Sequence, residues 1–228
     1  NPTGVQFGRS VGDTSKGRQH NEKVFDATPG LALDRFKAAI HSLVTPRNQQ
    51  WHGLATADED LSEDPEVMRY LQEVTNRLFG ARYRANFDSE VQGCYGGGGK
   101  YGSFAMFVGE RPGQGLYYRG VPIEQCYFAE NEYGTIDLFH RDWFWTARQA
   151  YARWGDKLPS VIKDAAERRP DQQFRFLHVV KPRTDADVGR LDHKGMAFVS
   201  YYVHVETRTV VEEGGFRTFP YAVGRYDL

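Results

Sequence analysis

The sequence predicts an α+β protein in which helices come first and antiparallel strands follow. Two segments in the first third of the chain repeat apolar residues at spacings of three and four, the period of an amphipathic helix. After about residue 103, β-branched and aromatic residues instead cluster between short turn sequences, which is typical of strands. With 228 residues, 40% of them hydrophobic, the chain can bury a core as one large domain or two small ones.

The first helix is predicted to begin at Thr28 and to end one or two residues before Pro46. Thr28 is expected to be the N-cap, and Pro29 suits the first turn, where its missing N–H has no partner to lose. Pro46 ends the helix because it disfavours the α conformation of the residue before it. Trp51 follows and is expected to anchor packing. The apolar face comprises Leu33, Phe36, Ile40 and Leu43.

The second helix is predicted to follow an acidic loop, Asp58–Asp64. Asp64 is its expected cap, with Pro65 at the first position and Glu66 in the first turn, and Gly80 is expected to end it. The apolar face comprises Val67, Tyr70, Leu71, Val74 and Leu78.

A third, shorter helix is expected from about Asn86 toward Cys94, where four glycines, Gly96–Gly99, break it. The glycines and Lys100 do not form a phosphate-binding P-loop, because that motif needs a Gly at position 94 and a Ser or Thr after the lysine. A G-x-G-x-x-G match has a helix before it and a strand after it, the reverse of a dinucleotide site. We interpret the run as a flexible or tightly turned joint.

Four strands are predicted next, as one antiparallel meander with turns at residues 111–115 and 131–134. They cover residues 104–108, 116–119, 125–129 and 135–145. Thr146 and Gln149 then form a capping box, which predicts a helix that Gly155 closes. Pro159 opens another helix that ends before Pro170.

A second, all-β unit is predicted from Phe174 onward. Its strand-like runs are FRFLHVVKP, MAFVSYYVHVE and TVVEEGG, with a turn at Thr207 and Arg208 between the last two. A charged excursion, RTDADVGRLDHKG at residues 183–195, separates the first two runs. The first 23 residues are polar and glycine-rich, and we expect an arm that orders by packing on a neighbour.

The bulk composition excludes several classes of protein. The formal net charge is −1, so the chain lacks the overall excess of basic residues that is typical of proteins that hold DNA mainly through its phosphates. Cys94 and Cys126 lie far apart without CxxC spacing, which predicts neither a disulfide framework nor a zinc site. No apolar run approaches the roughly 20 residues that span a bilayer, so we expect a soluble protein. Because the chain starts at Asn1, we expect a piece of a longer protein.

Three candidate chemistries have a simpler structural interpretation. The seven histidines show no metal-ligand spacing, and those in strand-like runs are expected to play ordinary hydrogen-bonded roles. The acids of residues 58–66 could pair as hydrolase carboxylates but are more typical of caps and solvated surface. The aromatic residues between 143 and 154 could stack sugars or bases, but core or interface packing explains them better. These aromatics are Trp143, Phe144, Trp145, Tyr151 and Trp154.

Across nearly its whole length the chain resembles the portal proteins of tailed phages, also called head-to-tail connecting proteins. The resemblance begins with the D-x-T helix start, the T-P stop and the following tryptophan in residues 26–51. It continues through SEDPEVMRYLQEVTNRLFGARYRANFDSEV, GSFAMFVGE, LYYRGVPIEQCYFAENEYGTIDLFHRDWFWTARQ and the strands from FLHVVKPR onward. The glycine-rich GCYGGGGKYGS stands where the family usually carries a continuous apolar helix end.

The resemblance implies the N-terminal part of a portal-protein fold. Residues 1–24 would be an arm, 25–157 a wing of helices and antiparallel strands, 158–171 a stem helix and 172–228 a β-rich, clip-like unit. The returning stem helix, tunnel loop and crown would lie outside this chain. The implied function is structural: a dodecameric ring at one capsid vertex, without enzymatic activity, cofactor or metal.

The implied partners are further copies of the chain, the terminase large subunit, tail adaptor and tail proteins, and capsid and scaffolding proteins. Double-stranded DNA would pass through without sequence-specific binding or membrane contact. The protein would be assembled in the host bacterial cytoplasm and reside in the virion. Loops on a rigid β scaffold often carry binding, so partner docking is assigned to the charged excursion. Its candidate residues are Arg183, Asp185, Asp187, Arg190, Asp192 and Lys194.

Two alternatives from other classes stay open at this point. One is a β-rich tail-adaptor or carbohydrate-binding module that uses the aromatic residues as its platform. The other is a hydrolase that uses the carboxylates of residues 58–66.

Overall fold

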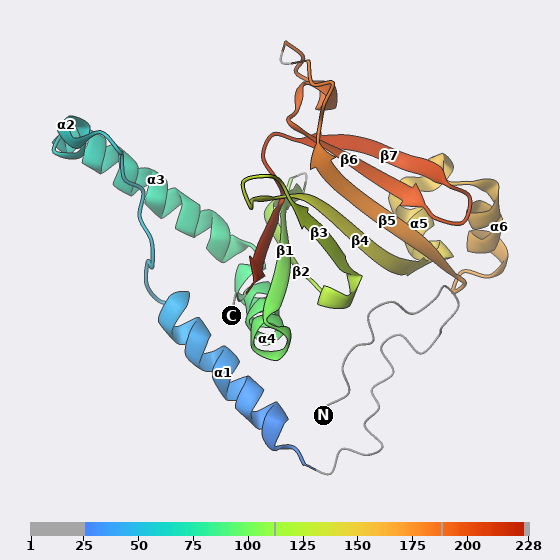
Figure 1. Ribbon diagram of the computed structural model, residues 1–228, viewed down its shortest axis with the longest axis horizontal. Helices are drawn as coiled ribbons and strands as arrows, with labels where there is room; N and C mark the ends of the chain where they lie inside the picture. The colour runs from blue at the N-terminus through green and yellow to red at the C-terminus, as the bar shows by residue number, and fades with distance from the viewer. Residues whose placement is uncertain (1–25, 112, 188, 226–228) are drawn as a thin grey trace. The chain divides into compact units, whose positions relative to one another are not determined.

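The computed structural model describes residues 26–225 except 112 and 188, and it confirms the α+β class (Figure 1). Two compact units are present. One contains the chain up to Glu124 and again from Gly224, and the other contains Gln125–Val223. The expected N-terminal arm, residues 1–24, lies outside the described residues.

The helices of the first unit follow the local sequence signals closely. Asp64 caps the third of them, because its Oδ1 accepts a hydrogen bond from the Glu66 amide at 2.7 Å. At the first helix the N-cap is Ala27, and Thr28 is already helical. The acidic loop, expected to be irregular, contains a short helix, and the following helix continues past Gly80. Their bounds are α1 Thr28–Val44, α2 Glu59–Ser62, α3 Pro65–Arg84 and α4 Phe87–Tyr101.

Helix α4 runs through all four glycines, so the predicted break at Gly96–Gly99 is wrong. The helix ends instead at Gly102, whose positive φ of 71° is a left-handed conformation that glycine adopts readily. Glycine is a poor helix former, but tertiary packing overrides propensity when a helix has a close neighbour.

That neighbour is α1, which packs against the glycine side of α4. A Cβ atom on Gly99 would lie 2.8 Å from the ring of Phe36, and one on Gly96 would lie 3.0 Å from Cδ of Lys37. The glycines therefore allow the two helices to approach closely, and the run is a packing surface rather than a joint.

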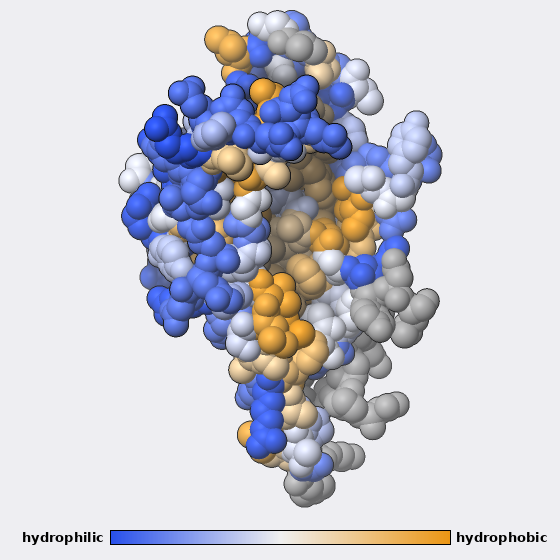
Figure 2. Space-filling model, turned by 90° about the vertical axis from the view of Figure 1, so that its left-hand side faces the viewer, coloured by the Kyte–Doolittle hydropathy of each residue, from blue (hydrophilic) through white to orange (hydrophobic). Residues whose placement is uncertain are grey.

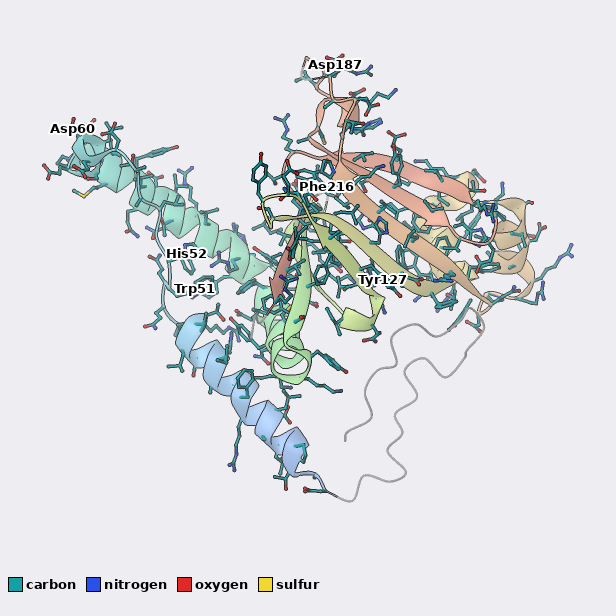
Figure 3. The ribbon with its side chains drawn as sticks, viewed as in Figure 1. Trp51, His52, Asp60, Tyr127, Asp187 and Phe216 are labelled. Atoms are coloured by element: carbon teal, nitrogen blue, oxygen red, sulfur yellow. The ribbon has the colours of Figure 1, made fainter. Side chains whose placement is uncertain are left out.

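Trp51 is the packing anchor that the sequence predicted, in the segment between α1 and α3 (Figure 3). Its ring centroid lies 5.9 Å from that of Phe79 and 6.2 Å from that of Phe87. The Arg82 guanidinium lies 4.6 Å from the indole centroid and donates a hydrogen bond to Nε2 of His52 at 2.8 Å. Desolvation and the Arg82 charge lower the pKa of His52, which keeps its ring neutral and able to accept.

The strands form two antiparallel sheets rather than the single meander expected. One has the order β2-β1-β8 and the other the order β3-β4-β5-β6-β7. A 3₁₀ turn, Ile123–Gln125, follows β2, and the next strand joins the second sheet. The bounds are β1 Ser103–Arg111, β2 Gly115–Val121, β3 Cys126–Glu130, β4 Ile136–Thr146, β5 Gln173–Pro182, β6 Phe198–His204, β7 Thr209–Phe216 and β8 Tyr221–Arg225.

The all-β unit expected to start at Phe174 is not separate. β5 pairs with β4 from Gln173 opposite Thr146 to Val180 opposite Phe139, so the later strands share a sheet with earlier ones. Sequence pattern identifies strands but not their partners, which explains the error.

The core of the second unit lies between the five-stranded sheet and the helices α5, Ala147–Trp154, and α6, Ser160–Arg168. Trp154 fills this core and donates from Nε1 to the Glu212 carboxylate on β7 at 2.7 Å. The buried members of the cluster are Trp143, Ala147, Ala150, Trp154, Leu158, Ile162, Ala165, Phe174, Phe176 and Val211.

The capping box of α5 is present as predicted. The Thr146 hydroxyl accepts from the Gln149 amide at 3.3 Å, and the Gln149 side chain accepts from the Thr146 amide at 3.0 Å. Thr146→Ala should lower the free energy of unfolding by about 1 kcal/mol, as measured by urea denaturation. Thr218→Ala, at an exposed threonine outside any helix cap, should change it by less than about 0.5 kcal/mol. Equal effects of the two substitutions would refute the capping role.

A buried polar network occupies the same unit. His178 on β5 places Nδ1 2.7 Å from the Tyr221 hydroxyl and Nε2 2.9 Å from the Ser200 hydroxyl. Its ring stacks on Tyr202 with centroids 4.1 Å apart. The ordinary hydrogen-bonded role expected for a strand histidine is confirmed at His178.

Candidate functional site

The six charged residues assigned to docking lie in or beside the loop that connects β5 and β6. Residues 183–197 leave the ends of these strands as a protruding excursion, with Asp187 near its outer end (Figures 1 and 3). The loop contains one 3₁₀ turn, η4, at His193–Gly195.

The loop is held in shape by its own backbone. The Asp187 amide donates to the carbonyl of Lys194 at 3.1 Å, and the Arg190 amide donates to the carbonyl of Asp187 at 2.9 Å. Gly195 fits where a Cβ atom would collide with the Arg190 carbonyl. These contacts between the two arms of the loop indicate a folded excursion rather than an extended one.

Arg190 and Asp192 form an ion pair inside the loop. Arg190 Nε lies 3.0 Å from Asp192 Oδ1, and a second nitrogen contacts the other carboxylate oxygen. The hydrogen bond from Arg190 lowers the pKa of Asp192, and Asp192 in turn raises the pKa of Arg190. Both side chains are exposed, so the pair fixes local geometry and contributes little to stability.

Arg183 has a different role from the other five residues. Its side chain is 3% exposed, and Nη2 lies 3.4 Å from the Gly214 carbonyl and 3.5 Å from the Glu213 carboxylate, both on β7. Its amide donates to the Ala197 carbonyl at 2.8 Å, which extends the pairing of β5 with β6 by one step. Arg183 therefore fastens the base of the loop to the sheet, a role that charge patterning could not reveal.

The outer part of the loop presents a mixed surface to solvent. Asp185 is 83% exposed, and Asp187 and Lys194 are exposed as well. Leu191 is 90% exposed, and the charge pattern did not single it out. The signal available in the sequence was an apolar side chain within a run of charged residues.

Two of the acids proposed for a hydrolase, Asp58 and Asp64, serve as helix caps. Asp58 Oδ1 accepts from the Asp60 amide at 3.1 Å, in the same way that Asp64 caps α3. All of the acids from 58 to 66 are exposed, and Figure 3 shows Asp60 among them, beside α2. The geometry favours the surface interpretation over a catalytic pair.

Two other arrangements that resemble catalytic motifs are unsuited to catalysis. The contact between Ser200 and His178 joins side chains that are 3% and 2% exposed, so a substrate cannot reach it. Lys100 lies in the last turn of α4, whereas phosphate binds at a helix N-terminus.

The aromatic residues considered as a sugar platform mostly belong to the core. Trp143 and Trp154 are buried, and Trp145 packs against them. Phe144 and Tyr151 remain exposed. Core packing, the simpler interpretation, is confirmed for the three tryptophans.

Residues 26–225, apart from 112 and 188, contain no group of three or more His, Cys, Asp or Glu side chains placed to hold a metal ion. Among these residues no helix combines the length and the apolar character needed to cross a membrane.

The amino-acid sequence is similar to a family of phage proteins along its whole length. The sequence model of the family described as Bacteriophage head to tail connecting protein matches residues 1–228. The portal protein of Salmonella phage epsilon15 is 25% identical over 232 residues, which cover 100% of this chain and 41% of that protein. The probable portal protein of Bordetella phage BPP-1 is 24% identical over 223 residues, 96% of this chain and 40% of that protein. The chain thus spans about two fifths of the length of these relatives.

Proposed function

Because the chain belongs to the bacteriophage head to tail connecting protein family, we propose that it is the N-terminal part of a portal subunit. Twelve copies of the full-length protein would form a ring at one capsid vertex, through which DNA enters during packaging and leaves during ejection. The observation that carries this proposal is the family match over all 228 residues, together with two relatives that are named as portal proteins.

The surface of the first unit supports assembly with further subunits. Helix α1 has seventeen described residues and none of them is buried, and α3 buries Thr75 and Phe79 among its twenty. Helices with so little packing are marginally stable alone, and exposed apolar faces of this kind are typical of surfaces that bind another protein.

Charge balance supports a conduit role. A channel through which DNA slides must not hold phosphates strongly, and a formal net charge of −1 is consistent with weak, non-specific contact. The motor that moves the DNA would be the separate terminase, with no catalysis by this protein. The portal protein itself would assemble in the host cytoplasm and would then lie at the portal vertex of the virion.

The proposed regions of the ring are a wing at residues 25–157, a stem helix at 158–171 and a clip at 172–228. Since β4 and β5 pair within one sheet, the wing and the clip would be continuous rather than separable modules. Terminase and the tail adaptor would dock on the outer part of the β5–β6 loop, where Asp185, Asp187, Leu191 and Lys194 are exposed. Capsid, scaffolding and tail proteins would contact other surfaces of the ring.

Replacement of the loop tests both parts of the proposal. In the full-length protein, residues 184–194 would be exchanged for a short Gly/Ser linker, while Arg183 and Gly195 are kept because they shape the base. We expect negative-stain images to show intact rings, with terminase binding at least tenfold weaker and DNA packaging reduced.

The matched control is the double substitution Asp185→Asn and Lys194→Gln, which keeps the backbone contacts of the loop. It should retain rings and show a smaller loss of terminase binding than the linker variant. Rings that package DNA normally with the linker would refute docking at this loop. A full-length wild-type protein that stays monomeric would refute the portal assignment itself.

A further inference from the structure

A groove of about 350 Å³ lies in the first unit between α1, α4 and the first two strands. Its floor is the side of α4 that carries Gly93, Gly96 and Gly97 at spacings of three and four. At Gly93 a Cβ atom would meet nothing within 4 Å, so the helix backbone is open to close approach there. Apolar side chains form its walls, among them Leu33 from α1 and Phe104 from β1. The volume is within the range of roughly 300–1,000 Å³ typical of binding pockets.

The flank of this groove is also uncovered. Helix α1 leaves large apolar side chains exposed along its length, and Figure 2 shows hydrophobic side chains gathered over the lower part of the view, where α1 lies. These side chains are Leu31, Phe36, Leu43 and Val44, with exposed fractions of 62%, 43%, 78% and 52%. A short peptide in the groove would leave them in water, so the occupant must also bring a folded body against α1.

The chain itself supplies a segment with matching chemistry. Val5 and Phe7 are two residues apart, the spacing at which two side chains would share one side of a segment bound in an extended conformation. Arg9 is the sole charged side chain among residues 1–11, and the groove is lined by Glu90 and Glu124 against one lysine. Sixteen residues separate Val11 from Thr28, which gives a reach of roughly 55 Å when extended.

We propose that residues 5–11 of a second copy of this chain occupy the groove beside α4, while the body of that copy covers α1. The inference rests on the proposed ring. A ring closes through contacts between two different surfaces of each subunit, and here the groove is one surface and the N-terminal segment is the other. Each subunit gives its segment to one neighbour and receives a segment from the next.

Disulfide trapping in the full-length protein tests the inference. Phe7→Cys is combined with Gly93→Cys, where a new Cβ meets nothing within 4 Å, so the fold is not at risk. The control combines Phe7→Cys with Gly30→Cys, an equally open position on α1 that does not line the groove. Burial raises the pKa of the neighbouring Cys94 thiol to about 11, so Cys94 does not compete at pH 8.

Under mild oxidation we expect the 7–93 pair to link subunits into covalent chains on non-reducing gels, at least tenfold more than the 7–30 pair. A mixture of the two single variants should give covalent dimers. The substitution Phe7→Asp should weaken ring assembly at least tenfold, and Phe7→Leu should preserve it.

Three results would overturn the inference: rings with no excess of 7–93 linkage, rings in which the 7–93 disulfide forms within one chain, and rings unaffected by Phe7→Asp. In each case rings still form, so the portal assignment survives. Absence of rings in the wild-type protein would instead defeat the portal assignment, and the inference with it.

Discussion

Acidification from pH 7 to pH 4.5 should lower the free energy of unfolding of the second unit by about 2–3 kcal/mol through His178 alone. Burial lowers the pKa of this imidazole from 6.5 to about 3, and the positive charges of Arg153 and Arg141 act in the same direction. The ring is therefore neutral in the folded protein, where the hydroxyls of Tyr221 and Ser200 are its hydrogen-bond partners.

The direction of the effect follows from proton binding. An unfolded chain protonates His178 near pH 6.5, whereas the folded protein does so near pH 3, so the unfolded state binds more protons between these values. The stability is complete above pH 6.5 and falls by about 1.4 kcal/mol for each pH unit toward pH 3. Burial also lowers the pKa values of His52, His140 and His204. On acidification the whole protein should therefore lose more stability than the titration of His178 accounts for.

Substitution isolates the contribution of His178. His178→Gln keeps an amide that can donate and accept but removes the titrating ring. Urea denaturation at pH 7 and pH 4.5 should show a pH-dependent loss smaller by about 2–3 kcal/mol than in the wild type. Tyr221→Phe removes one hydroxyl partner but keeps the buried ring, so it should lower stability at both pH values and leave the slope unchanged. A His178→Gln slope equal to that of the wild type would show that the acid sensitivity arises elsewhere.

The features that sequence predicted well are those whose physical cause is local. Asp64 caps α3 because its carboxylate reaches amides two residues away, and Thr146 with Gln149 caps α5 for the same reason. Pro46 disfavours the α conformation of Thr45, the residue before it, and α1 accordingly ends at Val44. Alternation of residue types was enough to place most strands, because it records which positions face a core.

The features that sequence missed depend on partners distant in the chain. The break expected at Gly96–Gly99 was wrong because α1, some sixty residues earlier, packs on that side of the helix. The single meander was wrong because β2 and β3 belong to different sheets. The separate all-β unit was wrong because β5 pairs with β4, as at Val180 and Phe139. Arg183 was grouped with exposed charges because its contact on β7, Glu213, lies thirty residues away. At the proposed docking loop, sequence located the segment but could not separate its base from its exposed part.

Gly99→Leu should release α1 from α4, with a loss of about 1–3 kcal/mol in the stability of that contact. A Cβ at this position would already lie 2.8 Å from the Phe36 ring and 3.2 Å from Leu33, and a leucine adds three further carbons. The remaining attachment of α1 is weak. It includes a hydrogen-bond chain in which Thr45 Oγ1 lies 3.0 Å from Nδ1 of His41 and 2.8 Å from the Tyr95 hydroxyl.

Amide hydrogen exchange is the appropriate measurement, because local opening of α1 need not unfold the rest of the unit. Protection across Thr28–Val44 should fall roughly tenfold to a hundredfold in Gly99→Leu, since 1.4 kcal/mol corresponds to a factor of ten. Gly99→Ala should be nearly neutral, because a gain of about 0.5–1 kcal/mol in helix propensity offsets the displacement of the half-exposed Phe36 ring. Gly93→Ala gains the same propensity with no atom within 4 Å, so it should raise the protection of α4. If Gly99→Leu behaved like Gly93→Ala, the absence of a side chain at Gly99 would have no part in the packing of α1 on α4.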